Sequence, residues 1–334
     1  MKHFNIPLFV PHKGCPNDCV FCNQKRITAH TSSVTSDMVD NTLQEYLKTL
    51  PVNSYIEAAF FGGSFTGIPI EEQDALLSVA KKYYDKGLIS GIRLSTRPDY
   101  INKEILDLLK SKSVTTIELG VQSLDSEVLH LSNRGHSKEI VYESSKLIKD
   151  YGFSLGLQMM TGLPGDNFKK SEKTAEEFIK IKPDFVRIYP TLVIKDTMLS
   201  DMYYSGAYIP QSTEEAVRLC KHLKSMFLKN KIQVIRVSLQ PTEEISLKAS
   251  VVAGPFHPAF GELVDNAMYY DLILEALSGI SDCTAILGVN PKDVSKAVGN
   301  KKINVIKIKE EKNICLKVKP VKDIDTGVRL IGVE

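Results

Sequence analysis

Short apolar runs alternate with longer amphipathic stretches through the first two-thirds of the chain. Runs of this kind are typical of strands that are buried on both faces of a sheet. The stretches between them carry apolar residues at helical spacing, which is typical of helices packed on a sheet. The predicted strands are Ile6 to Val10, Ile56 to Phe61, Ile92 to Ser95, Thr116 to Val121, Leu155 to Met160 and Phe185 to Tyr189.

The predicted helices lie between these strands, and each begins with polar or capping residues. They are Ser36 to Leu50, Glu71 to Asp85, Lys103 to Lys110, Ser137 to Asp150 and Lys170 to Ile181. Repeated β-α units favour a parallel sheet of the α/β class, and six of them predict a barrel, complete or partial. Because the chemistry of parallel barrels lies at the C-terminal ends of the strands, the residues that follow each strand are candidates for a functional site.

The last third of the chain adds further elements. Thr213 to Lys229 predicts an amphipathic helix, and Ile232 to Leu239 predicts a further strand against the open edge of the barrel. A loop rich in proline and glycine, Gly254 to Gly261, precedes an apolar helix at about Leu263 to Leu277. We expect three parts: a barrel over residues 1–240, a helical or lid extension over residues 241–280 and a small basic α+β unit over residues 281–334.

The small unit contains two predicted strands, Ala285 to Val289 and Ile314 to Val318, and a helix, Pro291 to Val298. Two interpretations of Ile303 to Lys309 stay open, because its apolar and charged residues alternate well enough for a strand of a plain hairpin. A helix there would give a β-α-α-β order that resembles the core of an RNA-binding KH domain. Gly299-Asn300-Lys301-Lys302 then lies at the place of the GxxG loop, with a lysine where the second glycine belongs.

The composition is that of a soluble globular protein. With 334 residues, of which 43% are hydrophobic, the chain can bury one large core or two smaller ones. The charged fraction of 25% is ordinary for such a protein. The net charge is only +2, but ten lysines against three acidic residues lie between Lys292 and Lys322. The basic charge is therefore concentrated towards the C-terminal end.

The six cysteines do not resemble the disulfide framework of a secreted domain, because three are clustered and three are isolated. The residues after Met1 open no apolar segment of signal-peptide length. No stretch approaches the roughly 20 apolar residues of a membrane helix. We expect a soluble, cytoplasmic protein with no membrane partner.

The clustered cysteines, Cys15, Cys19 and Cys22, form the motif C-x3-C-x2-C directly after the first predicted strand. Thiolates are soft ligands that suit iron-sulfur clusters, zinc or copper(I), and the short gaps bring the sulfurs to one side of a loop. A structural zinc ion needs a fourth ligand, which His12 would supply. A four-iron cluster on three cysteines instead keeps one iron open for a small molecule, which favours chemistry over scaffolding.

This spacing, with Phe21 before the last cysteine, resembles the signature of the radical S-adenosylmethionine (SAM) enzymes. The resemblance implies a partial (β/α)6 TIM-like barrel, a 4Fe-4S cluster on the three cysteines and SAM chelated by the open iron, with Phe21 beside the cofactor. In that superfamily an electron, which we expect from a flavodoxin or ferredoxin type of donor, cleaves the sulfonium. The resulting 5'-deoxyadenosyl radical abstracts a hydrogen from the substrate.

Paired glycines follow the second strand in Phe61-Gly62-Gly63-Ser64, where the missing Cβ atoms let the backbone approach a ligand. Their position, one strand after the cysteine loop, resembles the GGE-type motif of the superfamily. The backbone of that motif grips the amino group of the methionine moiety, which assigns Gly62, Gly63 and Ser64 to the cofactor. Ser64 replaces the acid of the motif and leaves a hydroxyl without charge.

Longer strings after the later strands resemble the radical domain of the Elongator complex catalytic subunit, over a match from about Cys15 to about Val237. The product of that family is a carboxymethylated wobble uridine, so the resemblance implies a tRNA-like substrate. The residues after Gln240 contain no Q/R-x-x-G-x-G loop for coenzyme A, so no acetyl-CoA site is expected. The strings are Leu94 to Asp99, Glu118 to Ser123, Asn133 to His136, Met159 to Gly165 and Pro183 to Lys195.

Position by position, this resemblance assigns further residues. Arg134 would pair the methionine carboxylate, because an arginine donates two parallel hydrogen bonds, and Gln122 would also contact SAM. Ser95 and Gln158 fall where relatives hold the ribose hydroxyls, although a glutamate is more usual at the position of Ser95. The substrate candidates are Arg187, Tyr189 and Lys195 at the last barrel strand, His257 in the proline-rich loop, and Gly299, Lys301 and Lys302 in the small unit.

We therefore expect a radical SAM enzyme that modifies RNA. One alternative is a radical enzyme on a small molecule, similar to the oxygen-independent coproporphyrinogen oxidases, which share the barrel motifs. The other is a non-catalytic, metal-bearing RNA-binding protein.

Overall fold

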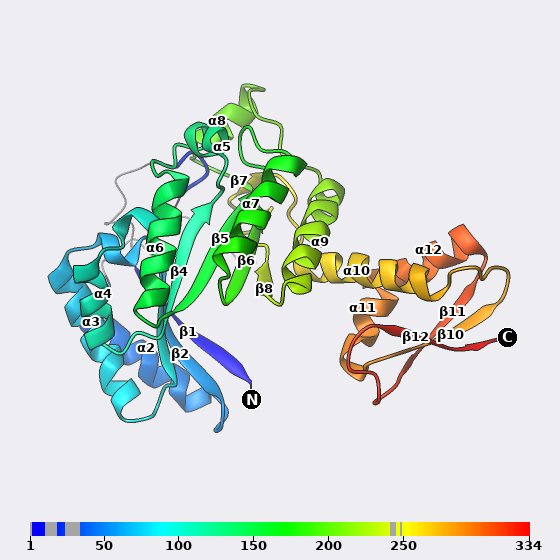
Figure 1. Ribbon diagram of the computed structural model, residues 1–334, viewed down its shortest axis with the longest axis horizontal. Coiled ribbons are helices and arrows are strands. Elements are labelled where there is room, and N and C mark those ends of the chain that lie inside the picture. The colour runs from blue at the N-terminus through cyan, green and yellow to red at the C-terminus, as the bar shows by residue number, and fades with distance from the viewer. Residues whose placement is uncertain (1, 11–18, 24–33, 241–244, 248) are drawn as a thin grey trace. The chain divides into compact units, whose positions relative to one another are not determined.

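The computed structural model describes residues 2–10, 19–23, 34–240, 245–247 and 249–334, so Cys15 and His12 lie outside the described residues. The chain forms two compact units, which are considered separately (Figure 1). Unit 1 comprises the described residues of Met1–Gln211 and Met226–Phe256, and unit 2 those of Ser212–Ser225 and His257–Glu334. The boundaries expected at residues 240 and 280 stay a prediction.

Unit 1 is built on a sheet of seven parallel strands in the spatial order β1-β2-β3-β4-β5-β6-β8, which curls into a half-barrel (Figure 1). This confirms the predicted partial barrel, including the further strand at its edge. Because every neighbouring pair is parallel, the C-terminal ends of all strands meet at one rim. The strands are β1 His3–Val10, β2 Tyr55–Gly62, β3 Gly91–Thr96, β4 Thr116–Gln122, β5 Ser154–Thr161, β6 Phe185–Pro190 and β8 Gln233–Val237.

The connecting helices pack along the outer face of the sheet (Figure 1). Side chains cap three of them: Thr35 accepts from the N–H of Met38, and Asn102 and Asn167 accept from the N–H three residues on. Each predicted helix is present. The helices are α2 Ser36–Thr49, α3 Ile70–Asp85, α4 Lys103–Ser111, α6 Lys138–Asp150 and α7 Phe168–Ile181.

The strands separate apolar from charged side chains. In β3, Ile92 and Leu94 are 0% exposed and point to the outer, helix-covered face. Arg93 and Ser95 alternate with them and therefore point to the concave side. The concave side carries charged residues on neighbouring strands as well, and these form the layer beneath the candidate site.

Two short α-helices and two short strands in the described part of unit 1 were not predicted. Two of them, β7 and β9, pair in an antiparallel ribbon beside the rim. Gly254 follows this ribbon with a φ of +103°, and a Cβ there would lie 2.8 Å from the carbonyl oxygen of Thr191. The glycine is therefore needed for a close backbone approach. The elements are α5 Ser126–Leu131, α8 Met198–Tyr204, β7 Val193–Ile194 and β9 Val251–Ala253.

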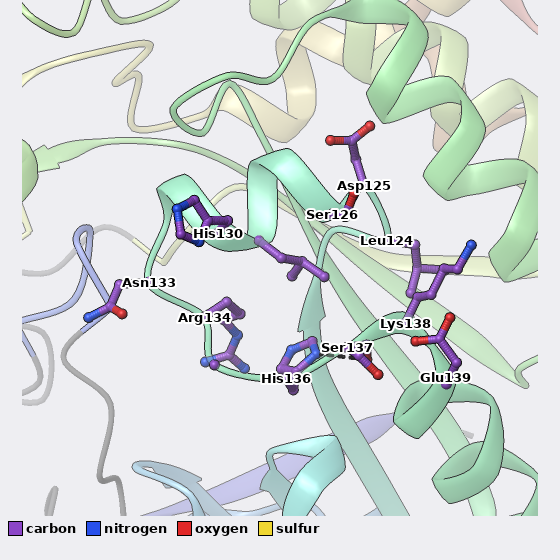
Figure 2. Close-up of a pocket in the computed structure, with 12 residues that line it drawn as sticks. Leu124, Asp125, Ser126, His130, Asn133, Arg134, His136, Ser137, Lys138 and Glu139 are labelled. Atoms are coloured by element: carbon purple, nitrogen blue, oxygen red, sulfur yellow. Dashed lines mark hydrogen bonds between the residues drawn. The ribbon is translucent and has the colours of Figure 1, made fainter.

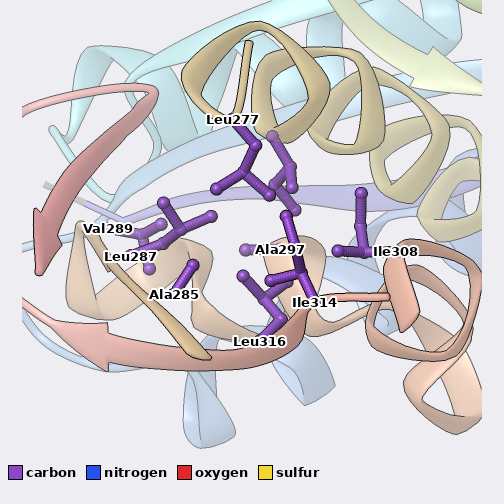
Figure 3. Packing of buried hydrophobic residues seen from close by; sticks show 9 residues of the cluster. Leu277, Ala285, Leu287, Val289, Ala297, Ile308, Ile314 and Leu316 are labelled. Atoms are coloured by element: carbon purple, nitrogen blue, oxygen red, sulfur yellow. The ribbon is translucent and has the colours of Figure 1, made fainter. Parts of the chain in front are cut away.

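Unit 2 contains a three-stranded sheet in which β10 lies between a parallel strand, β11, and an antiparallel strand, β12. Helices on one face of this sheet close a core that includes Leu277, Leu287 and Ile308 (Figure 3). The strand β12 was not predicted. The elements are α10 Phe260–Ala276, β10 Thr284–Val289, α11 Val294–Val298, α12 Ile303–Lys312, β11 Cys315–Pro320 and β12 Val328–Val333, with α9 Thr213–Lys229 shared between the units.

The hairpin interpretation of Ile303 to Lys309 is wrong, because these residues form the first turns of α12. Asn304 and Ile308, four residues apart, are both buried, and this helical spacing turns one stripe of α12 into the core. The amide of Asn304 donates to the carbonyl oxygens of Asn266 and Ala297 at 2.9 and 3.1 Å. These tertiary bonds select the helix over the strand that the alternation of residues allows.

Candidate active site

The described residues of the cysteine loop, 19–23, contact the loops at the rim of the half-barrel. The side chain of Cys19 is buried, with 5% of its surface exposed, and its carbonyl oxygen accepts from the N–H of Cys22 at 2.9 Å. Val20 forms two backbone hydrogen bonds to other segments. Its N–H donates to the carbonyl oxygen of Ser132 at 3.2 Å, and its carbonyl oxygen accepts from the N–H of Leu199 at 2.7 Å. The loop is thus fixed between the residues after α5 and the start of α8.

Phe21 is partly buried and packs against an apolar cluster beside the cysteine loop. The cluster contains Val20, Val193, Leu199 and Tyr208, which come from the loop, β7 and α8 and the segment after it. This packing anchors the described part of the cysteine loop on β7 and α8. It gives Phe21 a structural contact, and its predicted contact with the cofactor stays a prediction.

Arg134 brings the loop after α5 into contact with the cysteine loop. Its Nη1 lies 3.3 Å from the Sγ of Cys19, and its Nη2 donates to the carbonyl oxygen of Gly120 at the end of β4. The carbonyl oxygen of Arg134 itself accepts from Arg97 Nη2 at 2.8 Å, and Arg97 pairs with Asp99 at 2.9 Å. Arg134 is only 6% exposed, and its Nε has no partner among the described residues.

Gln122 lies next to this arginine at the C-terminal end of β4. It adopts a left-handed conformation with φ of +71°, and its Oε1 is buried without a partner in the described part of the chain. A Cβ on Gly120 would lie 3.2 Å from Gln122 Nε2 and 3.3 Å from Arg134 Nη2. The absence of that Cβ lets the two predicted cofactor ligands converge.

The paired glycines join the ends of the first two strands. The N–H of Gly63 donates to the carbonyl oxygen of Val10 at 3.0 Å, and Gly62 has a φ of +107°. Ser64 is buried, and its hydroxyl contacts Thr96 Oγ1 at 2.8 Å and accepts from the N–H of Arg97 at 3.1 Å. The hydroxyl therefore ties the end of β2 to the end of β3.

A buried layer of charge lies below the rim on the concave face. Glu118 on β4 is 0% exposed and accepts from Arg93 Nη1 at 2.9 Å, from Arg187 Nε at 2.7 Å and from Gln158 Nε2 at 2.9 Å. Arg93 also pairs with Glu57 on β2. The layer thus fixes the amide of Gln158, because its nitrogen is bound to Glu118. The amide oxygen of Gln158 is then oriented away from Glu118, where it can accept from another donor.

Arg187 and Tyr189 share the concave face of β6. Burial alone lowers the pKa of the Arg187 guanidinium, but the adjacent Glu118 carboxylate raises it above its ordinary value. Burial has the opposite effect on the Tyr189 phenol, whose pKa it raises. Arg187 is therefore a permanently charged member of the layer. Lys195 lies just after β7 with an exposed side chain, and its carbonyl oxygen accepts a hydrogen bond from Asn23 Nδ2 at 3.1 Å.

A cavity of about 570 Å³ opens beside Arg134 and is lined by residues between Leu124, after β4, and Glu139, in the first turn of α6 (Figure 2). His136 lies in its wall, 9% exposed, and its Nε2 has no partner among the described residues. Burial and the neighbouring Arg134 lower the pKa of this imidazole from 6.5 to about 4. His136 is therefore neutral near pH 7.

The remaining substrate candidates belong to unit 2. The Nδ1 of His257 accepts from the N–H of Ala259 at 3.1 Å, which is a local turn contact before α10. Gly299 has a φ of +80°, and a Cβ there would lie 2.7 Å from Ile303 Cγ2. Lys301 and Lys302 follow in left-handed conformations between α11 and α12, with both side chains exposed.

Three features of the candidate site were not predicted from the sequence. They are the brace of Arg97 on Arg134, the acceptor role of Glu118 and the buried His136. Arg97 and His136 stand in the strings that carry the family resemblance, and Glu118 interrupts an apolar strand. A charged residue inside a strand that is otherwise buried is the signal that points to such a layer.

The chain matches two families of known proteins. It matches the family described as the Radical SAM superfamily over residues 9–178 and the Radical_SAM C-terminal domain over residues 183–270. It is 32% identical over 199 residues to the tRNA uridine(34) acetyltransferase of Methanocaldococcus jannaschii, covering 54% of this chain and 37% of that protein. Human Elongator complex protein 3 is 32% identical over 191 residues, covering 51% of this chain and 35% of that protein. The chain thus spans about a third of the length of these curated relatives.

Solved structures agree with these matches. The archaeal Elongator protein 3 of Methanocaldococcus infernus, with an N-terminal deletion, superimposes with a TM-score of 0.63 at 25% identity, covering 80% of this chain and 63% of that one. Coproporphyrinogen III oxidase from Escherichia coli, a radical SAM enzyme, shares the fold with a TM-score of 0.50 at 16% identity, covering 69% and 52%. Within the described residues, every helix is too short or too polar to span a bilayer. The family match covers half of the chain and the half-barrel agrees with it: this protein is an enzyme of the radical SAM superfamily, related to the radical SAM region of the Elongator and tRNA uridine acetyltransferase proteins.

Proposed function

We propose that the chain holds a 4Fe-4S cluster on Cys15, Cys19 and Cys22, binds SAM beside it and acts on an RNA substrate. The cluster, when bound, supplies the electron that cleaves the sulfonium and yields the 5'-deoxyadenosyl radical. The observation that carries the proposal is the convergence of Cys19, Arg134 and Gln122 at the rim of a radical SAM half-barrel.

The described residues fit these two groups. Buried polar atoms without partners cost about 1–3 kcal/mol each, so the bare Oε1 of Gln122 and the bare Nε of Arg134 favour a ligand that pairs them. SAM carries the matching groups, because its amino group and adenine amine donate and its carboxylate accepts. The thiolate of a buried Cys19 is a soft donor that suits iron.

Each rim residue then has a role in holding SAM. Arg134 orients the carboxylate, and the backbone of Gly62 and Gly63 offers acceptors to the amino group without a Cβ in the way. Gln158 directs its amide oxygen to a ribose hydroxyl, because its nitrogen is bound to Glu118. The concave wall of the half-barrel excludes water from the reacting atoms.

RNA is the proposed substrate for two reasons. The relatives that share the barrel include a tRNA uridine(34) acetyltransferase, whose name states an action on tRNA. Unit 2 presents exposed lysines on the turn between α11 and α12, Lys301 and Lys302, which suit the phosphates of a nucleic-acid backbone. A flavodoxin or ferredoxin type of protein is the proposed electron donor.

The substrate proposal is tested by anaerobic incubation of the reconstituted full chain with reductant and SAM. Total RNA and a small-metabolite extract are added separately, and 5'-deoxyadenosine is measured. We expect RNA to raise its yield above the level without substrate. A rise with the metabolite extract alone would favour the small-molecule alternative and reject RNA.

The role of the unit 2 lysines is tested by the double variant K301Q/K302Q. Each phosphate contact adds about 0.7 to the slope of log affinity against log salt for a single strand, so we expect the slope to fall by about 1.4. The matched control is K169Q/K173Q on the exposed face of α7, which should keep the wild-type slope. An unchanged slope in K301Q/K302Q would exclude this turn from RNA binding.

A further inference from the structure

We propose that Arg134 donates a hydrogen bond to the cluster ligand Cys19 and raises the reduction potential of the cluster through that bond. The inference rests on the proposed function, because it requires iron on Cys19. The contact that carries it is the 3.3 Å approach of Arg134 Nη1 to Cys19 Sγ. It gives Arg134 a role towards the metal in addition to its proposed role towards the methionine carboxylate.

The guanidinium is held at Cys19 by the protein alone. Its Nη2 donates to the carbonyl oxygen of Gly120, which fixes the plane of the group. Both backbone polar groups of Arg134 are also hydrogen-bonded. Its N–H donates to the carbonyl oxygen of Leu129 at 2.9 Å, and its carbonyl oxygen accepts from Arg97 Nη2 at 2.8 Å. The arginine is therefore preorganised next to the cysteine loop before any ligand arrives.

The two roles of Arg134 are chemically compatible. A guanidinium has five N–H donors, and the described contacts to Cys19 and Gly120 use one each on Nη1 and Nη2. The Nε of Arg134 has no partner among the described residues, so its N–H, together with a second hydrogen of a terminal nitrogen, can bind a carboxylate. Arg134 can hold SAM without releasing the sulfur.

The direction of the effect follows from charge. Cys19 and Arg134 are 5% and 6% exposed, so their interaction is weakly screened by water. Reduction adds an electron to the cluster and makes its cysteine sulfurs more negative, which strengthens a hydrogen bond from a cation. Hydrogen bonds to sulfur and local charge are established determinants of iron-sulfur potentials. Arg134 therefore stabilises the reduced state.

The test is a redox titration of the reconstituted full chain, followed by the electron paramagnetic resonance of the reduced cluster in the absence of SAM. We expect R134M to shift the reduction equilibrium about tenfold towards the oxidised state, which is 59 mV for one electron. R134K keeps the charge and loses the planar fork, so its potential should lie between those of R134M and the wild type. The control K138Q removes an exposed cation from the same segment and should leave the potential unchanged.

The outcomes separate this inference from the proposed function. A wild-type chain that carries zinc, or no cluster, would reject both. A wild-type chain with a four-iron cluster, together with an R134M cluster at the wild-type potential, would reject the inference alone. If R134M does not load iron, R134K decides, because a wild-type potential in R134K would overturn the inference and a lower potential would support it.

Discussion

Replacing Glu118 by glutamine tests whether the buried charged layer holds the half-barrel together. The carboxylate accepts four hydrogen bonds, one from Arg93, two from Arg187 and one from Gln158, at 2.7 to 2.9 Å. Arg93 keeps its pair with Glu57 in the variant, so the main loss falls on Arg187, which is 7% exposed. Breaking a buried pair by removing one partner costs about 3–5 kcal/mol.

This cost is large enough to measure by thermal unfolding. For a unit of this size each kcal/mol lowers Tm by about 2–4 °C, so E118Q should unfold about 10 °C below the wild type. Circular dichroism of the full chain follows the transition, and E139Q, at an exposed glutamate in the first turn of α6, is the control. A Tm of E118Q within about 2 °C of the E139Q value would refute the structural role of the layer.

Three further predictions concern residues of unit 1. The pKa of His136 is about 4 in the folded protein and 6.5 in the free side chain, so the stability that its burial leaves intact above pH 6.5 is lost as the pH falls towards 4. Between pH 7.5 and 4, the free energy of unfolding of H136N should therefore fall by about 3 kcal/mol less than that of the wild type, as measured by urea unfolding. Equal losses in the two proteins would contradict the burial argument. G156A should lower the free energy of unfolding by about 1–3 kcal/mol, because the new Cβ would lie 2.4 Å from the ring of Phe185; an unchanged urea midpoint would show that the ring moves freely. G120A should weaken SAM binding, measured by calorimetry, because the new Cβ would lie 3.2 Å from Gln122 Nε2. If G120A bound SAM with the affinity of the wild type, Gln122 would not belong to the cofactor site.

Much of the half-barrel was predictable because its strands are short apolar runs with helices between them. Such runs have few alternatives once they are buried on both faces. The segment from Ile303 was not predictable, since its residues suit a strand as well as a helix. The choice depended on where Asn304 and Ile308 meet residues that are distant in the sequence. The strand β12 was missed for a related reason, because its exposed and partly buried residues give no strong pattern.

The candidate site was predictable only as a list of residues. The motifs placed Gln122 at the end of a strand and Arg134 in the segment that follows it, and the structure brings both around Gly120. The contact of Arg134 with Cys19 joins residues 115 positions apart, and no local pattern encodes it. The hydroxyl of Ser64 was assigned to the cofactor, and the structure places it in contacts with Thr96 and Arg97 instead of leaving it bare. Its cofactor role stays a prediction.

Metal and cofactor analysis of the full chain tests the central claim most directly. Protein prepared without air and reconstituted with iron and sulfide should carry about four irons per chain, because the proposed cluster on the three cysteines contains four. It should release 5'-deoxyadenosine from SAM on reduction, and C19S should release none. Stoichiometric zinc at the cysteine loop, or SAM left intact by a reduced four-iron protein, would contradict the account.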